Sequence, residues 1–262
     1  MSASQSASSG PDTTVVEVRD LHKRFGGNHV LDGVSFALCE GERAVVLGRS
    51  GSGKSVLLRH LVGLVQPDSG SISLFGQELV GLSRAALYQL RLQVGVLFQG
   101  AALLDSMTVY ENVTLGLRTH GIHSEADLRR RAAAKLAEVG LPGIEDSMPA
   151  SLSGGMRKRV GLARAVAMDP RMVLYDEPTT GLDPVMSDVI NNLILQYARR
   201  TRMTSVVVTH DMTSAFKVGT RFLMLHKGRI IFDGDVGALR GCTDPRIAGF
   251  IAGDAGALDL LR

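Results

Sequence analysis

The sequence predicts an α/β fold with a mostly parallel sheet, because two observations agree. Short runs rich in β-branched and apolar residues alternate with amphipathic helical patterns from Val15 onward. A length of 262 residues suits one large domain with an inserted lobe better than two full domains. The expected strands are Arg43–Leu47, Val94–Phe98, Met172–Tyr175, Thr204–Thr209 and Arg221–His226.

Composition places the chain among ordinary globular proteins, with 45% hydrophobic and 21% charged residues. The 29 Lys and Arg residues are spread among 26 Asp and Glu residues, so nothing supports a nucleic-acid partner and we expect none. Two cysteines are too few for a disulfide framework or a zinc site. No apolar run approaches the roughly 18 to 20 residues of a membrane-spanning helix, so we expect no span in this chain.

The chain divides by pattern into a tail, a domain with a lobe, and an extension. The serine-rich residues 1–13 lack the apolar core of a signal peptide and predict a disordered tail. Within a domain of residues 14–240, the strand signal disappears at about residues 101–168, which predicts a helical lobe. Residues 241–262 are expected to form a C-terminal extension. The expected helices include Val109–Arg118, Ser124–Val139, Gly155–Met168, Val236–Arg240 and Pro245–Ala252.

A glycine-rich loop, Gly48–Ser55, fits the pattern G-x-x-x-x-G-K-[ST] between an expected strand and a helical pattern at Ser55–Val65. Its glycines let the backbone curl around an anion, so that N–H groups face phosphates. Lys54 would neutralise the outer phosphates and Ser55 would hold Mg²⁺. A glycine-rich turn without function is the alternative. The expected nucleotide-binding residues of this segment are Gly48, Arg49, Ser50, Gly51, Ser52, Gly53, Lys54, Ser55 and Val56.

Two acids, Asp176 and Glu177, follow the expected strand Met172–Tyr175. At a sheet edge Asp176 would lie near the Mg²⁺ ion, and Glu177 would act as general base beside the attacking water. By itself, an acidic pair after a strand is more often a helix cap or a solvated turn. The phosphate-binding loop upstream favours the catalytic interpretation.

A second anion-binding helix start is predicted at Ser153, which precedes Gly154 and Gly155. One nucleotide does not need two such sites. An ordinary serine cap is the alternative.

Together these motifs resemble those of the ATP-binding-cassette ATPases, over about residues 15–234. The resemblance implies a RecA-like P-loop NTPase core with an antiparallel β subdomain and an inserted helical subdomain. It also implies that Ser153, Gly154, Gly155 and Met156 contact nucleotide bound to the second subunit of a head-to-tail homodimer.

Further positions match that family in order and spacing, although each alone would be explained more simply as a core or solvated residue. The resemblance implies that Phe25 stacks on adenine, that Gln99 senses Mg²⁺ and water, and that His210 is the switch histidine. Asp183 falls in the implied dimer-contacting loop. The implied catalytic residues are Glu177, His210 and Gln99, the implied Mg²⁺ ligands are Ser55, Gln99 and Asp176, and the implied cofactors are ATP and Mg²⁺.

The chain departs from the commonest family pattern at three positions. Met156 stands where glutamine is usual, Val56 where a hydroxyl residue is frequent, and Phe25 where tyrosine is common. Met156 cannot hydrogen-bond as glutamine would, which puts one dimer contact in doubt. Phe25 keeps the aromatic face that stacking on a base requires.

The segment Leu152–Arg159, with methionine in the signature, resembles the Mla/Mce-associated ATPases. The segments Phe98–Val113 and Asp244–Gly253 resemble the same group. This implies a homodimer that energises phospholipid transport between bacterial membranes from the cytoplasmic face of the inner membrane. It would contact the membrane through two permease subunits and work with an Mce-domain protein. The alternatives are a cassette ATPase for another substrate, such as an amino acid or a metal chelate, and a soluble cassette protein of DNA repair or translation.

The apolar run Ala101–Leu104 beside Gln99 has two interpretations. It is either a docking surface for a permease helix or part of the core of the helical lobe. The resemblance favours docking.

Overall fold

The computed structural model describes residues 13–121 and 124–254. Most of the expected tail and the end of the expected extension therefore lie outside the described residues. Thr13, at the boundary of the tail, is already tied to the fold, because its carbonyl oxygen accepts a hydrogen bond from the Glu40 N–H at 2.9 Å.

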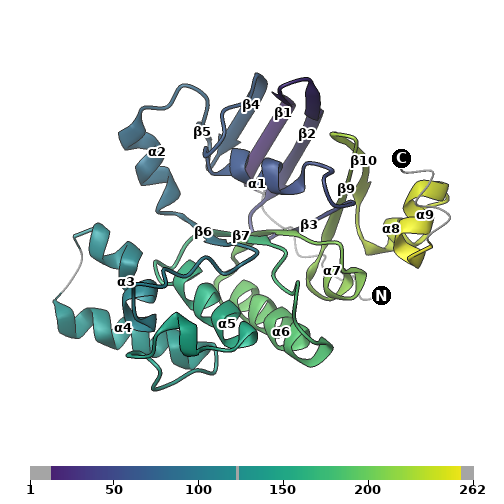
Figure 1. Cartoon of the computed structure of the whole chain (residues 1–262). Helices are drawn as coiled ribbons and strands as arrows, with labels where there is room; N and C mark the ends of the chain where they lie inside the picture. Colours follow the sequence, from purple (N-terminus) through teal and green to yellow (C-terminus); the bar gives the residue numbers. More distant parts are fainter. Residues whose placement is uncertain (1–12, 122–123, 255–262) are drawn as a thin grey trace, which may run out of the picture.

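A six-stranded sheet forms the centre of the molecule and confirms the predicted parallel α/β fold (Figure 1). Its order is β10-β9-β3-β8-β7-β6, parallel throughout except for the antiparallel edge strand β10. All five expected strands are present within one residue at either end. Their bounds are β3 Arg43–Leu47, β6 Val94–Leu97, β7 Met172–Asp176, β8 Thr204–Val208 and β9 Arg221–His226, and the sixth strand, β10 Arg229–Gly234, was not predicted.

A second, four-stranded antiparallel sheet packs above the first in Figure 1 and confirms the implied β subdomain. Its order is β2-β1-β4-β5, and the long hairpin of β1 and β2 turns between Phe25 and Asn28. The strands are β1 Thr14–Phe25, β2 Asn28–Cys39, β4 Ser69–Leu74 and β5 Gln77–Glu78.

Helices cover the other face of the central sheet (Figure 1). Those at the predicted lobe are α3 Val109–Thr119, α4 Glu125–Glu138, the short 3₁₀ helix Pro149–Ser151 and α5 Gly154–Ala165. The α5 helix starts one residue earlier and ends three residues earlier than expected, with Ser153 as its N-cap. On the same face lie α6 Pro184–Thr201 and α7 Met212–Val218. On the side of the antiparallel sheet lie α1 Lys54–Leu61 and α2 Arg84–Arg91, and beside β9 and β10 lie α8 Val236–Arg240 and α9 Pro245–Ala252.

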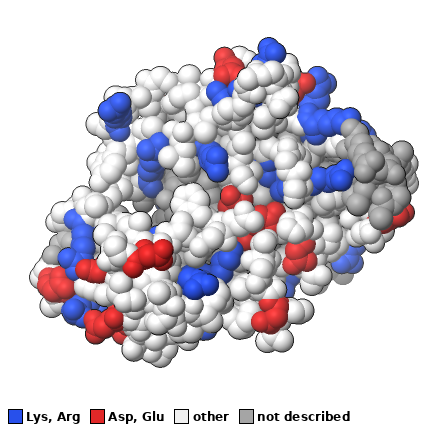
Figure 2. Space-filling model, in the orientation of Figure 1, with Lys and Arg blue, Asp and Glu red and all other residues white. Residues whose placement is uncertain are grey.

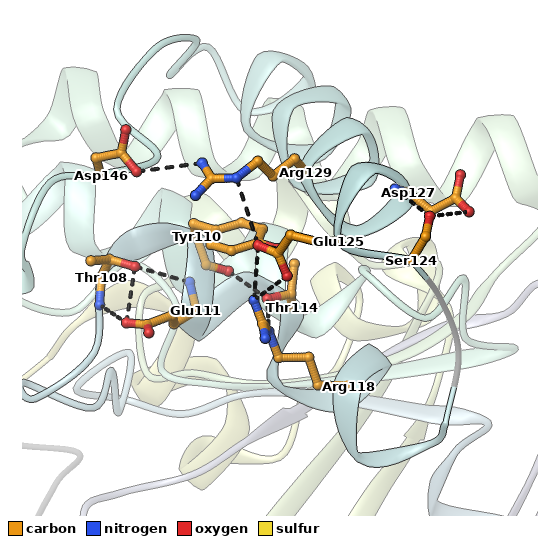
Figure 3. A network of polar contacts seen from close by, with 10 residues as sticks. All are labelled: Thr108, Tyr110, Glu111, Thr114, Arg118, Ser124, Glu125, Asp127, Arg129 and Asp146. Carbon is orange, nitrogen blue, oxygen red and sulfur yellow. Dashed lines mark hydrogen bonds and ion pairs between the residues drawn. The ribbon is translucent and has the colours of Figure 1, made fainter.

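The helices α3 and α4 are joined by a polar network around Tyr110 (Figure 3). The Tyr110 hydroxyl donates to Glu125 Oε1 at 2.6 Å, and the guanidinium groups of Arg118 and Arg129 lie 5.0 and 4.6 Å from the Tyr110 ring centre. Glu125 also pairs with Arg118 at 3.1 Å. The Glu125 carboxylate links both helices, and the Tyr110 ring lies between two guanidinium groups. These contacts hold α3 and α4 in a fixed position relative to each other.

The hydrophobic core lies on both faces of the central sheet, because successive side chains of β3 belong alternately to two different core clusters. Val45 and Leu47 join the cluster that faces α3, α5 and α6, whereas Ala44 and Val46 join the cluster beneath the antiparallel sheet. Since successive strand residues point to opposite faces, a strand buried on both sides becomes a continuous apolar run. This explains why the strand signals were strong. Among the described residues, no helix is both long and apolar enough to cross a bilayer.

Candidate nucleotide-binding and catalytic site

The carboxyl ends of the parallel strands meet at one edge of the central sheet, where loops after β3, β6, β7 and β8 surround a cavity of about 310 Å³. This is where open α/β sheets bind ligands. The cavity unites residues predicted from four separate segments of the sequence. Its lining consists of Val30, Ser50, Gly51, Gly53, Lys54, Ser55, Val56, Gln99, Glu177 and His210.

The phosphate-binding loop is shaped by glycine at two tight positions. Gly48 has φ +152°, and a Cβ atom on it would lie 2.4 Å from the Leu225 carbonyl oxygen. Gly53 has φ +101°, and a Cβ atom there would lie 2.7 Å from the Val30 carbonyl oxygen. Only glycine satisfies both the conformation and the close approach of backbone. The curvature of the loop therefore depends on glycine at these two positions.

Lys54 is buried at the start of α1 and held by its own loop. Its ammonium donates to the carbonyl oxygens of Gly48 at 2.7 Å and Arg49 at 2.9 Å. Burial lowers the pKa of Lys54, while the carboxylates of Glu177 and Asp176 oppose that shift. A cation placed this way is positioned to neutralise phosphate oxygens.

Ser55 and Asp176 meet as the Mg²⁺ prediction requires. The Ser55 hydroxyl donates to Asp176 Oδ1 at 2.9 Å, across 121 residues of sequence. Burial raises the pKa of Asp176, the neighbouring Glu177 raises it further, and the Ser55 hydrogen bond lowers it. Hydroxyl, carboxylate and amide oxygens are hard ligands that fit Mg²⁺. No group of three or more His, Cys, Asp or Glu residues suited to a metal occurs in the described part of the chain, and Mg²⁺ bound with nucleotide phosphates needs none.

Glu177 lies at the cavity with both carboxylate oxygens engaged. Its Oε1 pairs with His210 Nδ1 at 2.9 Å, and its Oε2 accepts a hydrogen bond from the Thr180 hydroxyl at 2.8 Å. Its φ of +50° is in the left-handed region, which residues with a side chain rarely adopt. Thr180 was not predicted, although a hydroxyl three residues after an acid in a turn is a usable signal.

Several predicted residues lie outside this cavity. Phe25 is 49% exposed at the end of the β1–β2 hairpin, so its ring is available for stacking. Ser153 accepts a hydrogen bond from the Met156 N–H at 3.2 Å, and Asp183 caps α6 by accepting one from the Met186 N–H at 2.9 Å. Both side chains therefore act as helix caps within this chain. Other predicted residues absent from the cavity lining are Gly48, Arg49, Ser52, Gly154, Gly155, Met156 and Asp176.

A protein-family model described as "ABC transporter" matches residues 31–180, which is more than half of the chain. The chain belongs to the ABC transporter family. The described fold agrees with that of solved ABC cassettes. A dimeric ATP-binding cassette solved in a post-hydrolysis state with ADP and Pi has a TM-score of 0.79 and 31% identity, covering 84% of this chain and 98% of that chain.

Curated ABC relatives differ in their stated cargo. The "Probable ribonucleotide transport ATP-binding protein mkl" of Mycobacterium tuberculosis is 40% identical over 91% of this chain. This chain spans 66% of the length of that relative. The "Intermembrane phospholipid transport system ATP-binding protein MlaF" of Escherichia coli is 35% identical, over 92% of this chain and 90% of that protein.

Proposed function

We propose that this chain is the ATP-hydrolysing subunit of an ABC transporter, with ATP and Mg²⁺ bound at the cavity described above. One observation carries the proposal: the phosphate-binding loop, Gln99, Glu177 and His210 line a single cavity, beside the Ser55–Asp176 pair. These are the parts that phosphoryl transfer needs, namely positioning, charge neutralisation and a base for the attacking water. In this proposal residues 14–240 form the cassette, about residues 101–168 its helical part, and residues 241–262 an extension.

The residues divide the work by their chemistry. Lys54 and the loop N–H groups hold the phosphates, and Ser55, Gln99 and Asp176 would hold Mg²⁺, which supplies positive charge at the phosphate oxygens. Glu177 accepts a proton from water. Each of its carboxylate oxygens has two lone pairs, and only one lone pair on each oxygen is used by Thr180 or His210. His210 orients the Glu177 carboxylate from the loop after β8.

The test is Glu177→Gln in the purified full chain. The variant should bind ATP normally yet hydrolyse it about 10²- to 10⁴-fold more slowly, because it keeps size and hydrogen bonding but loses the base. Lys54→Ala is the comparison, and it should weaken ATP binding measured by calorimetry. Near-normal turnover by Glu177→Gln would remove Glu177 from this role.

We also propose that two copies form a homodimer with shared ATP sites. Ser153, Gly154 and Gly155 do not line the cavity of their own chain, and Ser153 is exposed at the start of α5. A helix start with free N–H groups binds anions, so a nucleotide on a second copy is the fitting ligand. The solved relative with ADP and Pi is a dimer, which supports the same arrangement.

The proposed membrane partner is a pair of permease subunits, docked near Gln99. Leu104 is 42% exposed, while Ala101 is buried against the core. A groove of about 550 Å³ lies between α2, β6, α3 and α5 and is lined by residues that include Tyr88, Leu92 and Leu115, but not by Gln99 or Leu104. An apolar permease helix fits such a groove, which would place the chain at the cytoplasmic face of the inner membrane.

We propose phospholipid as the transported cargo, with an Mce-domain protein in the complex. The methionine signature and the likeness to MlaF support this proposal. Another cargo is the second candidate, favoured by the likeness to a relative named for ribonucleotide transport. Purifying the tagged chain with its partners from native membranes tests the choice. Phospholipid and an Mce-domain protein should be recovered, whereas a permease complex with neither would overturn the lipid assignment.

A further inference from the structure

A buried lysine on α5, Lys158, contacts the loop after β6, which carries Gln99, and the loop after β7, which carries Glu177. The proposed mechanism gives it no role. Its side chain is 5% exposed, and its ammonium donates to the carbonyl oxygen of Glu177 at 3.0 Å and to that of Gln99. Burial lowers the pKa of Lys158, and the carboxylates of Glu177 and Asp176 oppose that shift. A buried ammonium is retained only where it is well paired, and here its partners are two backbone carbonyl groups.

The contact with Glu177 fixes an unusual backbone conformation. Glu177 has φ +50°, a region that residues with a side chain rarely adopt. Its N–H donates to the Val208 carbonyl oxygen at 2.9 Å, and its own carbonyl oxygen accepts from Lys158. Both peptide groups of Glu177 are therefore held, and the carboxylate is directed toward His210 and the cavity.

The same face of α5 also holds the segment that carries Gln99. Gly161 lets α5 pack closely against this segment, since a Cβ atom on Gly161 would lie 2.9 Å from Leu97 Cδ1 and 3.0 Å from Ala101 Cβ. Farther along, the Arg164 guanidinium donates to the carbonyl oxygens of Ala101 at 2.6 Å and Ala102 at 2.7 Å. Residues three apart on a helix share a face, so Lys158, Gly161 and Arg164 act together on this segment.

We propose that Lys158 is a positioning residue for ATP hydrolysis, an inference that rests on the proposed function. Its ammonium ties the peptide groups of Glu177 and Gln99 to one point, so that both side chains reach the same cavity. Ser153 lies at the start of the same helix. A nucleotide at Ser153 would therefore contact the same helix that holds the loops of Glu177 and Gln99.

The test compares Lys158→Met with Lys158→Arg in the full chain. Lys158→Met keeps the length of the side chain and removes the charge and the donors. It should lower kcat about 10²-fold, because a small misplacement of catalytic groups costs that much, while the Kd for ATP stays within about twofold. Lys158→Arg keeps a charge and several donors and should restore most of kcat.

The matched control is Lys135→Met, another buried lysine of the helical lobe. Lys135 is 9% exposed, pairs with Asp169 at 2.6 Å, and does not line the cavity. Its replacement should lower the melting temperature and leave kcat unchanged. Rates are expressed per bound ATP, so that unfolded chains do not count. Where Lys158→Met fails to fold, Lys158→Gln replaces it under the same criteria, since its neutral and shorter side chain cannot reach both carbonyl oxygens.

The outcomes separate this inference from the proposed function. A wild-type chain without ATPase activity overturns the proposed function. If the wild type is active and Glu177→Gln is not, a kcat of Lys158→Met close to wild type overturns the role of Lys158 alone. Equal losses of kcat and ATP binding, or no recovery in Lys158→Arg, overturn it as well, because they indicate a general structural role.

Discussion

Gly48 and Gly51 show how neighbouring glycines in one loop serve different purposes. Both have positive φ, +152° and +81°, but their surroundings differ. A Cβ atom on Gly48 would meet the backbone of Leu225, whereas one on Gly51 would have no heavy atom within 4 Å. Gly48 is thus required by packing as well as by conformation, and Gly51 by conformation alone.

Gly48→Ala should therefore destabilise the chain far more than Gly51→Ala. We expect a loss of about 3–5 kcal/mol at Gly48, where backbone strain adds to a clash with β9. At Gly51 we expect a loss of about 1–2 kcal/mol, the usual penalty of the left-handed region. Urea unfolding without nucleotide measures both values. Equal losses would show that the Gly48 contact relaxes.

Hydrogen-bond partners, more than residue type, decide the roles of individual side chains in the site. Thr180 is an ordinary turn residue by sequence, yet its hydroxyl holds the carboxylate of Glu177. Ser153 and Asp183 are conventional caps within the chain, and their exposure leaves them able to contact a second copy.

At the scale of elements, the segment between β6 and α3 has a buried and an exposed part. Ala101 packs against α5, so the core interpretation of the apolar run holds for that residue. Leu104 points outward although its backbone is fixed, since its N–H donates to Asn112 Oδ1 at 2.8 Å and its carbonyl oxygen accepts from Asn112 Nδ2 at 3.1 Å. A rigid loop with an exposed leucine suits docking.

Leu104→Asp should lower recovery of permease with the tagged chain from native membranes, with little change in melting temperature. The reason is that a charge on an exposed docking residue weakens apolar contact without entering the core. Val80→Asp is the matched control, because Val80 is equally exposed, at 42%, just after β5. A large drop in melting temperature for Leu104→Asp, or unchanged recovery, would contradict the docking role.

At the scale of the whole molecule, the two sheets and the helical part present one nucleotide cavity and a separate, exposed helix start at Ser153. On the face drawn in Figure 2, Lys and Arg lie interspersed with Asp and Glu. In the proposed homodimer, the cavity of each copy would face the Ser153 helix start of the other, so that a symmetric pair would complete two shared sites.

Mixing Ser153→Arg chains with Glu177→Gln chains should restore part of the ATP hydrolysis that each lacks. In the mixed dimer, one site combines Glu177 of one chain with Ser153 of the other and carries neither change. As a control, a mixed dimer of one wild-type chain and one doubly substituted chain carries one defect in each site. It should therefore add no ATP hydrolysis to that of the wild-type dimers in the same mixture. Labelled mixed dimers that bind ATP without activity above either parent would contradict independent shared sites.

The sequence by itself determined the five parallel strands of the central sheet, most helices and the local chemistry of the loop. Strands buried on both faces become continuous apolar runs, and the loop needs glycines at fixed spacing before a lysine, so both leave marks within a few residues. The two acids were readable for the same reason, because Asp176 ends the apolar strand β7 and Glu177 directly follows it.

Only the tertiary structure decided which groups meet. Glu177 pairs with His210 across 33 residues, Lys158 reaches Gln99 across 59, and Ser55 meets Asp176 across 121. Such contacts follow from the order of parallel strands, which places the ends of distant segments at one edge of a sheet. A buried lysine on an amphipathic helix has no local pattern that sets it apart from a solvated one. Its partners are backbone carbonyl groups, and these are the same at every position of the sequence.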